Sequence, residues 1–247
     1  MSLWVLVACG PKYSEEIRFT WEVRKDDNVV EKDGIKIEHI LSQNINKSFF
    51  SRGKIIGLHD MQVTGSCKNS EGNSYTVNGW LPTETMVIVK LQITNNTDKV
   101  IRLNNSVIRM FDPAGNQHEP VDKGHIKSEY ENDIQRQATK ASVDCTDLIQ
   151  KGSSVGRLKL LEKNTELLPN LTWTGYVVFD TQSDDVMKLP GNWKLAIYDV
   201  PTEVDESGKV TRTSRFEVVF IVKKFKDFYK QEFAKDEVKL KTEEVVE

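Results

Sequence analysis

Alternation of apolar and polar residues is the clearest pattern in this chain. Two runs place an apolar side chain at every second position, namely Val87, Val89, Leu91 and Ile93 in one and Phe216, Val218, Phe220 and Val222 in the other. This period of two predicts strands with one buried face. Short segments rich in β-branched and aromatic residues complete the predicted strands: 16–24, 35–40, 55–64, 75–80, 85–94, 100–111, 158–162, 171–180, 193–199 and 214–222.

Turn-forming residues separate these runs. The sequences Asn-Asn-Thr-Asp at 95–98, Asp-Pro-Ala-Gly-Asn at 112–116 and Asp-Glu-Ser-Gly-Lys at 205–209 each stand between two predicted strands, and their residue types favour tight turns. Strands and helices do not alternate regularly. The pattern therefore predicts a mainly β protein, an antiparallel β-sandwich over residues 11–222.

Two polar segments fall outside the strand pattern. Residues 113–152 are predicted to be an insertion or long connection at one end of the sandwich, with a helix over about 128–140. Residues 223–247 hold seven Lys and seven Asp or Glu, and their aromatic residues repeat at helical spacing: Phe225, Phe228, Tyr229 and Phe233. This spacing predicts a charged amphipathic C-terminal helix or tail. It would dock on the protein's own sandwich, or alternatively meet a partner or a membrane surface.

The first ten residues carry the sharpest motif. Leu6-Val7-Ala8-Cys9, followed by Gly10, resembles a bacterial lipobox, in which a small side chain precedes the cysteine at the cleavage site. Cys9 would carry a diacylglyceryl group and its freed amine a further acyl chain, and two or more chains hold a protein stably at a bilayer. The basic region of a secretory signal is absent, so we expect the start to be truncated. The alternative is a short first strand with a buried cysteine.

The lipobox predicts a location as well as an anchor. No apolar run approaches the roughly 18 residues that a transmembrane helix needs. We therefore expect residues 1–10 to be a residual signal segment and the protein to be lipid-anchored in a bacterial cell envelope. Gly10 is not the aspartate associated with inner-membrane retention. This favours the outer membrane in a Gram-negative host and the cell surface in a Gram-positive one.

Three stretches together resemble a known family. They are MVIVKLQITNNTDK at 86–99, VIRMFDPAGN at 107–116 and LTWTGYVVFD at 171–180. Their order is similar to that in the telokin-like, immunoglobulin-fold extracellular domain of many bacterial lipoproteins. The resemblance covers roughly residues 55–199 and implies an immunoglobulin-like sandwich outside the cytoplasm. The family is largely of unknown function and offers no catalytic residues to carry over.

Composition and charge narrow the function classes. Of the 247 residues 38% are hydrophobic and 29% charged, which is enough for a packed core. The net charge of −3 leaves no positive excess to neutralise phosphates, so we exclude an electrostatic nucleic-acid binder. Three cysteines are too few for a disulfide scaffold. Once Cys9 is assigned to lipid, Cys67 and Cys145 remain, either as a disulfide, which an exported compartment permits, or as two unrelated buried thiols.

Candidate chemistry is sparse. Residues 152–156 read G-x-S-x-G, but no histidine follows Ser154, and a nucleophile elbow requires one; a flexible Gly/Ser turn explains the motif better. A second set falls at i, i+4, i+7 and i+11, where one helix face could present zinc ligands: His118, Asp122, His125 and Glu129. Pro120 and Gly124 oppose a continuous helix there, so a metal site and a solvated loop both remain open.

These observations lead to one main hypothesis and two alternatives. We expect a non-catalytic, lipid-anchored envelope protein with a binding or structural role and no cofactor. Its partners would be the membrane, through the lipid anchor, and an envelope protein or surface polymer. The alternatives are a soluble intracellular β-sandwich interaction module and a metal-dependent protein that uses the 113–152 insertion.

Overall fold

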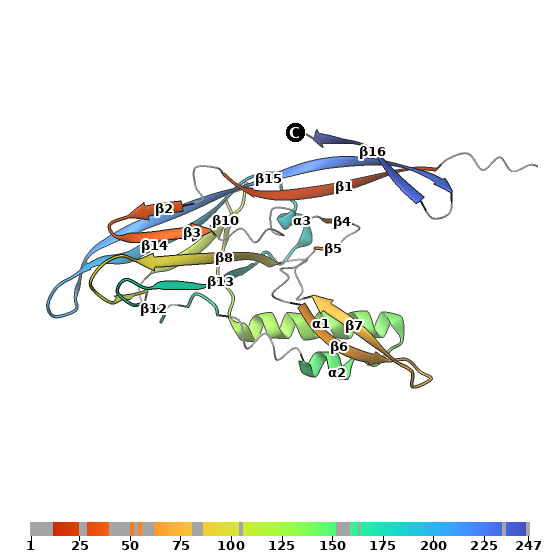
Figure 1. The fold of residues 1–247 in the computed structure, drawn as a ribbon, viewed down its shortest axis with the longest axis horizontal. Helices are drawn as coiled ribbons and strands as arrows, with labels where there is room; N and C mark the ends of the chain where they lie inside the picture. The colour runs from red at the N-terminus through yellow and green to blue at the C-terminus, as the bar shows by residue number, and fades with distance from the viewer. Residues whose placement is uncertain are drawn as a thin grey trace, which may run out of the picture.

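The protein is mainly β and its sheets are antiparallel, as the alternation predicts. The computed structural model describes residues 12–24, 29–39, 50–51, 54–55, 62–80, 86–103, 106–151, 159–162, 164–233 and 236–245. Within these residues the elements form two main sheets, three two-stranded pairs and three helices. Figure 1 shows that they lie in layers along one long axis.

The first main sheet has six strands in the order β1-β15-β14-β10-β11, with β16 also paired to β15. Their bounds are β1 Lys12–Val23, β10 Val107–Phe111, β11 Gln117–His118, β14 Gly191–Val204, β15 Val210–Phe233 and β16 Asp236–Val245. The second has four strands in the order β13-β8-β3-β2. These are β2 Val29–Lys32, β3 Ile35–His39, β8 Met86–Asn95 and β13 Thr172–Asp180.

The remaining elements are short. The two-stranded pairs are β4 Phe50–Ser51 with β5 Lys54–Ile55, β6 Gln62–Lys68 with β7 Ser74–Trp80, and β9 Ile101–Arg102 with β12 Glu166–Leu167. The helices are α1 Lys123–Ala141, α2 Thr146–Lys151 and α3 Asp184–Met187. None of the helices in the described part of the chain is both long and apolar enough to cross a membrane.

The main core lies between the two main sheets. Its buried side chains come from both of them and include Phe19, Trp21, Ile35, Val89, Leu91, Ile93, Phe179, Trp193, Leu195, Phe216 and Val218. The two apolar runs of the sequence pattern thus supply facing sides of one core, which confirms that each has a buried face. The rings of Trp21 and Trp193 pack with their centroids 4.8 Å apart.

A third layer covers the outer face of the second sheet. The helix α1 places Ile126, Tyr130, Ile134 and Ala138 against Met86 of β8 and against Tyr176 and Val178 of β13. The strand β13 is therefore buried on both faces over residues 175–179, whereas the outer face of β8 is fully buried only at Met86. In Figure 1, α1, α2 and the β6–β7 hairpin lie together below these strands. The 113–152 segment thus covers the face of a sheet instead of projecting from one end.

The boundaries of α1 follow from its caps. Asp122 accepts a hydrogen bond from the backbone N–H of His125 and begins the helix, because an N-cap side chain satisfies an otherwise unpaired donor. Ser142 adopts a left-handed conformation with φ 53° and ends it. The helix therefore begins five residues before the predicted start at 128, since Gly124 is tolerated in its first turn.

The predicted C-terminal helix over 223–247 is wrong. Phe225, Phe228, Tyr229 and Phe233 lie in β15, which pairs with β1 on one side and with β16 on the other. These neighbours satisfy the backbone of 224–231 on both edges, and the aromatic spacing contains no information about partners so distant in sequence. We call the three-stranded part, residues 12–18, 223–233 and 236–245, the ribbon. It extends the first sheet beyond the core (Figure 1).

Candidate functional site

The disulfide Cys67–Cys145 fastens the β6–β7 hairpin to the helical layer. The structure brings these two cysteines together, with their Cα atoms 4.2 Å apart, across 78 positions of sequence. Both side chains are buried, at 1% and 7% exposure. Beside the bond, the backbones of Lys68 and Asp144 exchange two hydrogen bonds of 2.7 and 2.8 Å. The hairpin is thus joined covalently and by main-chain pairing to the α1–α2 connection.

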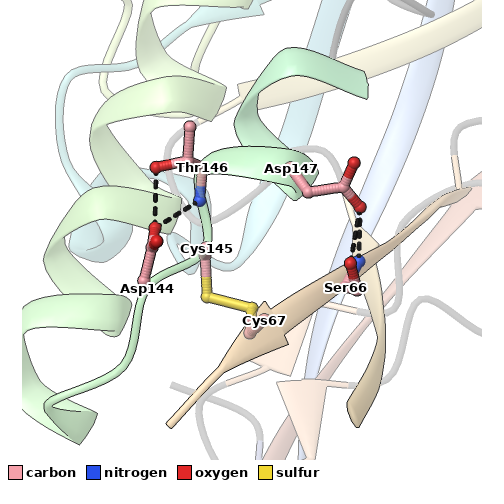
Figure 2. The surroundings of a disulfide bond; sticks show 6 residues. All are labelled: Ser66, Cys67, Asp144, Cys145, Thr146 and Asp147. Atoms are coloured by element: carbon pink, nitrogen blue, oxygen red, sulfur yellow. Dashed lines mark hydrogen bonds between the residues drawn. A yellow bond between two sulfur atoms is a disulfide. The ribbon is translucent and has the colours of Figure 1, made fainter. Parts of the chain in front are cut away.

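Two aspartates hold this junction together (Figure 2). Asp147 of α2 accepts hydrogen bonds from the backbone N–H of Ser66 at 3.0 Å and from its hydroxyl at 2.7 Å. Asp144 accepts from the hydroxyl and the N–H of Thr146 at 2.7 and 2.9 Å. These Thr146 hydrogen bonds lower the pKa of the Asp144 carboxyl. The carboxylates therefore fix the start of α2 against β6.

The predicted metal ligands do not form one site. His118 is on β11, and its Nε2 lies 3.3 Å from Asp112 Oδ2. His125 is on α1, and its Nε2 lies 2.8 Å from Asp180 Oδ2 at the end of β13. Among the residues that the structure describes, no group of three or more His, Cys, Asp or Glu could hold a metal ion.

The roles of Asp122 and Glu129 explain this separation. Asp122 Oδ1 accepts the N–H of His125 at 2.8 Å, so this carboxylate is used as a helix cap. Glu129 lies further along α1, where Asn132 Nδ2 approaches its Oε1 at 3.5 Å. The helix begins only at Lys123, which leaves His118 on a strand and breaks the helical spacing that the metal prediction required.

The turn after β10 is a compact polar cluster around Asp112. Its buried carboxylate accepts hydrogen bonds from the N–H and side-chain amide of Asn116, both at 2.8 Å, and faces His118. Burial acts to raise the pKa of Asp112, but the hydrogen bonds from Asn116 and His118 outweigh it and hold the pKa below 3.8. The ring of His118 stacks on Trp193 with centroids 5.9 Å apart. The cluster therefore fixes the edge of the first sheet.

A groove of about 360 Å³ opens beside this cluster. Its walls come from β10, from the chain leading into α1, and from the segment that pairs with β13; they include Ile108, Val121, Leu160 and Leu161. Arg109 and Glu119 form an ion pair of 2.7 Å at its rim. The groove thus combines apolar walls with a paired charge at its rim.

A second groove, of about 530 Å³, lies at the β14–β15 turn. Its apolar lining is Val100, Pro201, Val204 and Val210, and its basic lining is Arg102 and Lys209. Arg102 Nε lies 2.9 Å from Glu166, and Lys99 donates to the carbonyl of Val204 at 2.6 Å. This end of the molecule therefore presents apolar side chains with basic groups beside them.

The two remaining features singled out in the sequence, Cys9 and the 152–156 motif, lie outside the described residues.

Sequence reasoning missed the long-range pairs. Ser66 and Asp147 are 81 positions apart, and His125 and Asp180 are 55 apart. No local pattern signals such pairs. The Asp112 cluster was visible in part, because Asp-Pro-Ala-Gly-Asn is a turn sequence whose first side chain accepts from later residues.

Comparisons of the chain with protein-family models, with curated proteins and with solved structures give no match in any of the three.

Proposed function

We propose that this chain is a non-catalytic, lipid-anchored protein of the bacterial cell envelope with a binding or structural role. Its two-sheet body would be an immunoglobulin-like sandwich of the telokin-like kind. The anchor would be acyl chains on Cys9. The partner would be an envelope protein or a surface polymer, and nucleic acid is excluded by the charge balance.

The main support for the proposal is the different role of each cysteine: two form a disulfide, and one is left for acylation. Cys67 and Cys145 lie in a buried disulfide, a bond that persists in exported compartments and is rare in the cytosol. This leaves Cys9 as the single remaining cysteine, directly after Leu6-Val7-Ala8. An exported protein with one cysteine behind a small residue fits acylation at that thiol.

The body of the protein supports a binding or structural role. Two antiparallel sheets enclose one core, which supports the sandwich architecture that we propose. His118 and His125 lie against carboxylates that also accept backbone hydrogen bonds. These pairs brace turns and helix ends. The two grooves at the rims of the sheets offer surfaces for an amphipathic partner.

Metabolic labelling with palmitate tests the proposal. The natural reading frame is expressed in a bacterial host as wild type, as Cys9→Ala and, for a matched control, as the double variant Cys67→Ala/Cys145→Ala. We expect label on the wild type and on the double variant and none on Cys9→Ala. Absence of label from the wild type, or label retained by Cys9→Ala, would refute acylation at Cys9. The best-supported function would then be that of a soluble intracellular interaction module.

A further inference from the structure

The chain enters the described structure at the outer tip of the ribbon. Lys12 pairs with Gln231, and Gln231 pairs on its other side with Glu237, so these residues stand at one level across three strands. The β15–β16 connection follows at once, since Phe233 pairs with Asp236. The N-terminal end of β1 therefore lies beside the last turn of the ribbon, far from the core (Figure 1).

Cys9 precedes Lys12 by three residues, and three residues span at most about 10 Å. We propose that the tip of the ribbon rests on a phospholipid bilayer surface, with the body of the protein held away from it. This inference rests on the proposed acylation of Cys9, because the acyl chains fix that residue at the bilayer. The short connection leaves no other part of the described structure as near to the anchor.

The ribbon is long enough to hold the core away from the bilayer surface. The first core residue of β1 is Phe19, at 8% exposure. The seven residues of 12–18 precede it, and at about 3.3 Å per residue they extend roughly 23 Å. The core would therefore stand about that distance from the headgroups along the ribbon axis.

The described side chains of the ribbon begin a few residues inside its tip, where Leu240 lies level with Ser14 and Glu15. Ile17 and Leu240 are apolar and each is 51% exposed. The ring of Phe228 lies between two lysines, with Lys226 Nζ at 5.2 Å and Lys241 Nζ at 4.4 Å from its centroid. Lysine stems cover apolar surface while their ammonium groups remain in water. The ribbon thus presents apolar and aromatic groups bordered by amines.

The charges of the ribbon largely cancel. Lys226 pairs with Glu15 at 2.6 Å, Lys239 with the buried Asp227 at 2.9 Å, and Lys241 with Glu243 at 2.6 Å. A surface with this balance has no strong preference for anionic lipid, since such attraction requires excess positive charge. The acyl chains would supply the affinity, and the ribbon would set the orientation.

The opposite end of the long axis carries the β14–β15 turn and the groove beside it. In the proposed orientation this groove, lined by Val100, Arg102 and Val210, faces away from the bilayer. It is the end that a partner in the envelope would meet.

Lipid-quenching fluorescence tests the orientation on the acylated full chain. Protein purified from bacterial membranes is labelled at one introduced thiol with a fluorescent maleimide and placed in phosphatidylcholine vesicles that contain a nitroxide-headgroup lipid. Leu240→Cys and Ile17→Cys report on the ribbon, and Ser207→Cys, in the exposed β14–β15 turn, is the matched control. The buried disulfide and the acylated Cys9 leave no other thiol to react.

We expect the largest loss of fluorescence at Leu240→Cys, a smaller loss at Ile17→Cys, which lies about 16 Å from the tip at 3.3 Å per residue, and unchanged fluorescence at Ser207→Cys. Equal quenching at all three positions, or stronger quenching at Ser207→Cys, would overturn the orientation. Mass measurement of the same samples separates the two proposals. Acylated protein with the wrong quenching pattern overturns the orientation alone, whereas protein without acyl chains overturns both.

Discussion

The disulfide that joins the β6–β7 hairpin to the helical layer makes a quantitative prediction. Replacing both partners, as Cys67→Ser/Cys145→Ser, frees a loop that closes across 78 positions. The chain-entropy relation gives about 4.5 kcal/mol of stabilisation for a loop of that length. The hydrogen bonds of Asp144 and Asp147 to the hairpin do not depend on the sulfurs, so the fold should persist in the double variant with reduced stability.

Urea unfolding followed by circular dichroism measures the effect. We expect the free energy of unfolding to fall by about 3–5 kcal/mol. The melting temperature should fall by roughly 6–20 °C, since each kcal/mol is worth about 2–4 °C in a chain of this size. Dithiothreitol should lower the stability of the wild type by a similar amount and leave the double variant unchanged. A loss below about 1 kcal/mol would contradict the loop-closure argument, as would a double variant that still responds to the reductant.

Four further measurements check other parts of the structure. Asn95→Ala removes side-chain hydrogen bonds to two carbonyls and to Thr97 at a fully buried position; it should cost about 2–3 kcal/mol in urea unfolding, and the exposed Asn96→Ala should cost almost nothing. Gly175→Ala should destabilise by about 1–3 kcal/mol, because an added Cβ would collide with the Lys159 carbonyl and the Trp173 ring; a neutral result would refute that close approach. The pKa of Asp112 is lower in the folded protein than its usual 3.8, so the ionised carboxylate stabilises the fold above pH 3.8. This contribution is lost as the pH falls through the pKa of Asp112 in the folded state. Acid titration of Asp112→Asn should therefore show reduced stability at neutral pH and a shallower loss below pH 3.8; an unchanged curve would contradict it. Burial raises the pKa of Tyr130 from 10 to about 12, so stability should decline above pH 10, and tyrosinate absorbance should show one tyrosine, missing in Tyr130→Phe, that ionises late.

The strands of the core were predictable because their information is local. A period of two in 86–95 and 214–222 determines which side chains face inward, and tertiary contacts only choose the partner. The C-terminal aromatics were not predictable in the same way. Phe225 and Tyr229 fall on one side of β15 and Phe228 on the other, yet the same three positions are neighbours on a helix. Pairing with β1, about 200 positions earlier, makes this segment a strand and not a helix.

The candidate sites show the same division. The turn around Asp112 could be foreseen from its residue types, whereas the contact of His125 with Asp180 required the fold. The metal prediction depended on one helix running through His118, and a helix that begins at Lys123 removes that condition. For Cys67 and Cys145, sequence left two readings open because spacing gives no information on the distance between Cα atoms.

The unbroken course of β15 has a mechanical consequence. This one strand runs from the core into the ribbon, paired with β14 over its first part and with β16 beyond. The core and the ribbon are therefore connected by continuous β-strand, without an intervening loop in β15. A pull on the N-terminal end of β1, directed along the ribbon, would load the twelve residue pairs of β1 with β15 in parallel and not one after another. Such shear resists far larger forces than peeling does. An anchor attached at that end would therefore transmit tension to the core without unravelling the sheet.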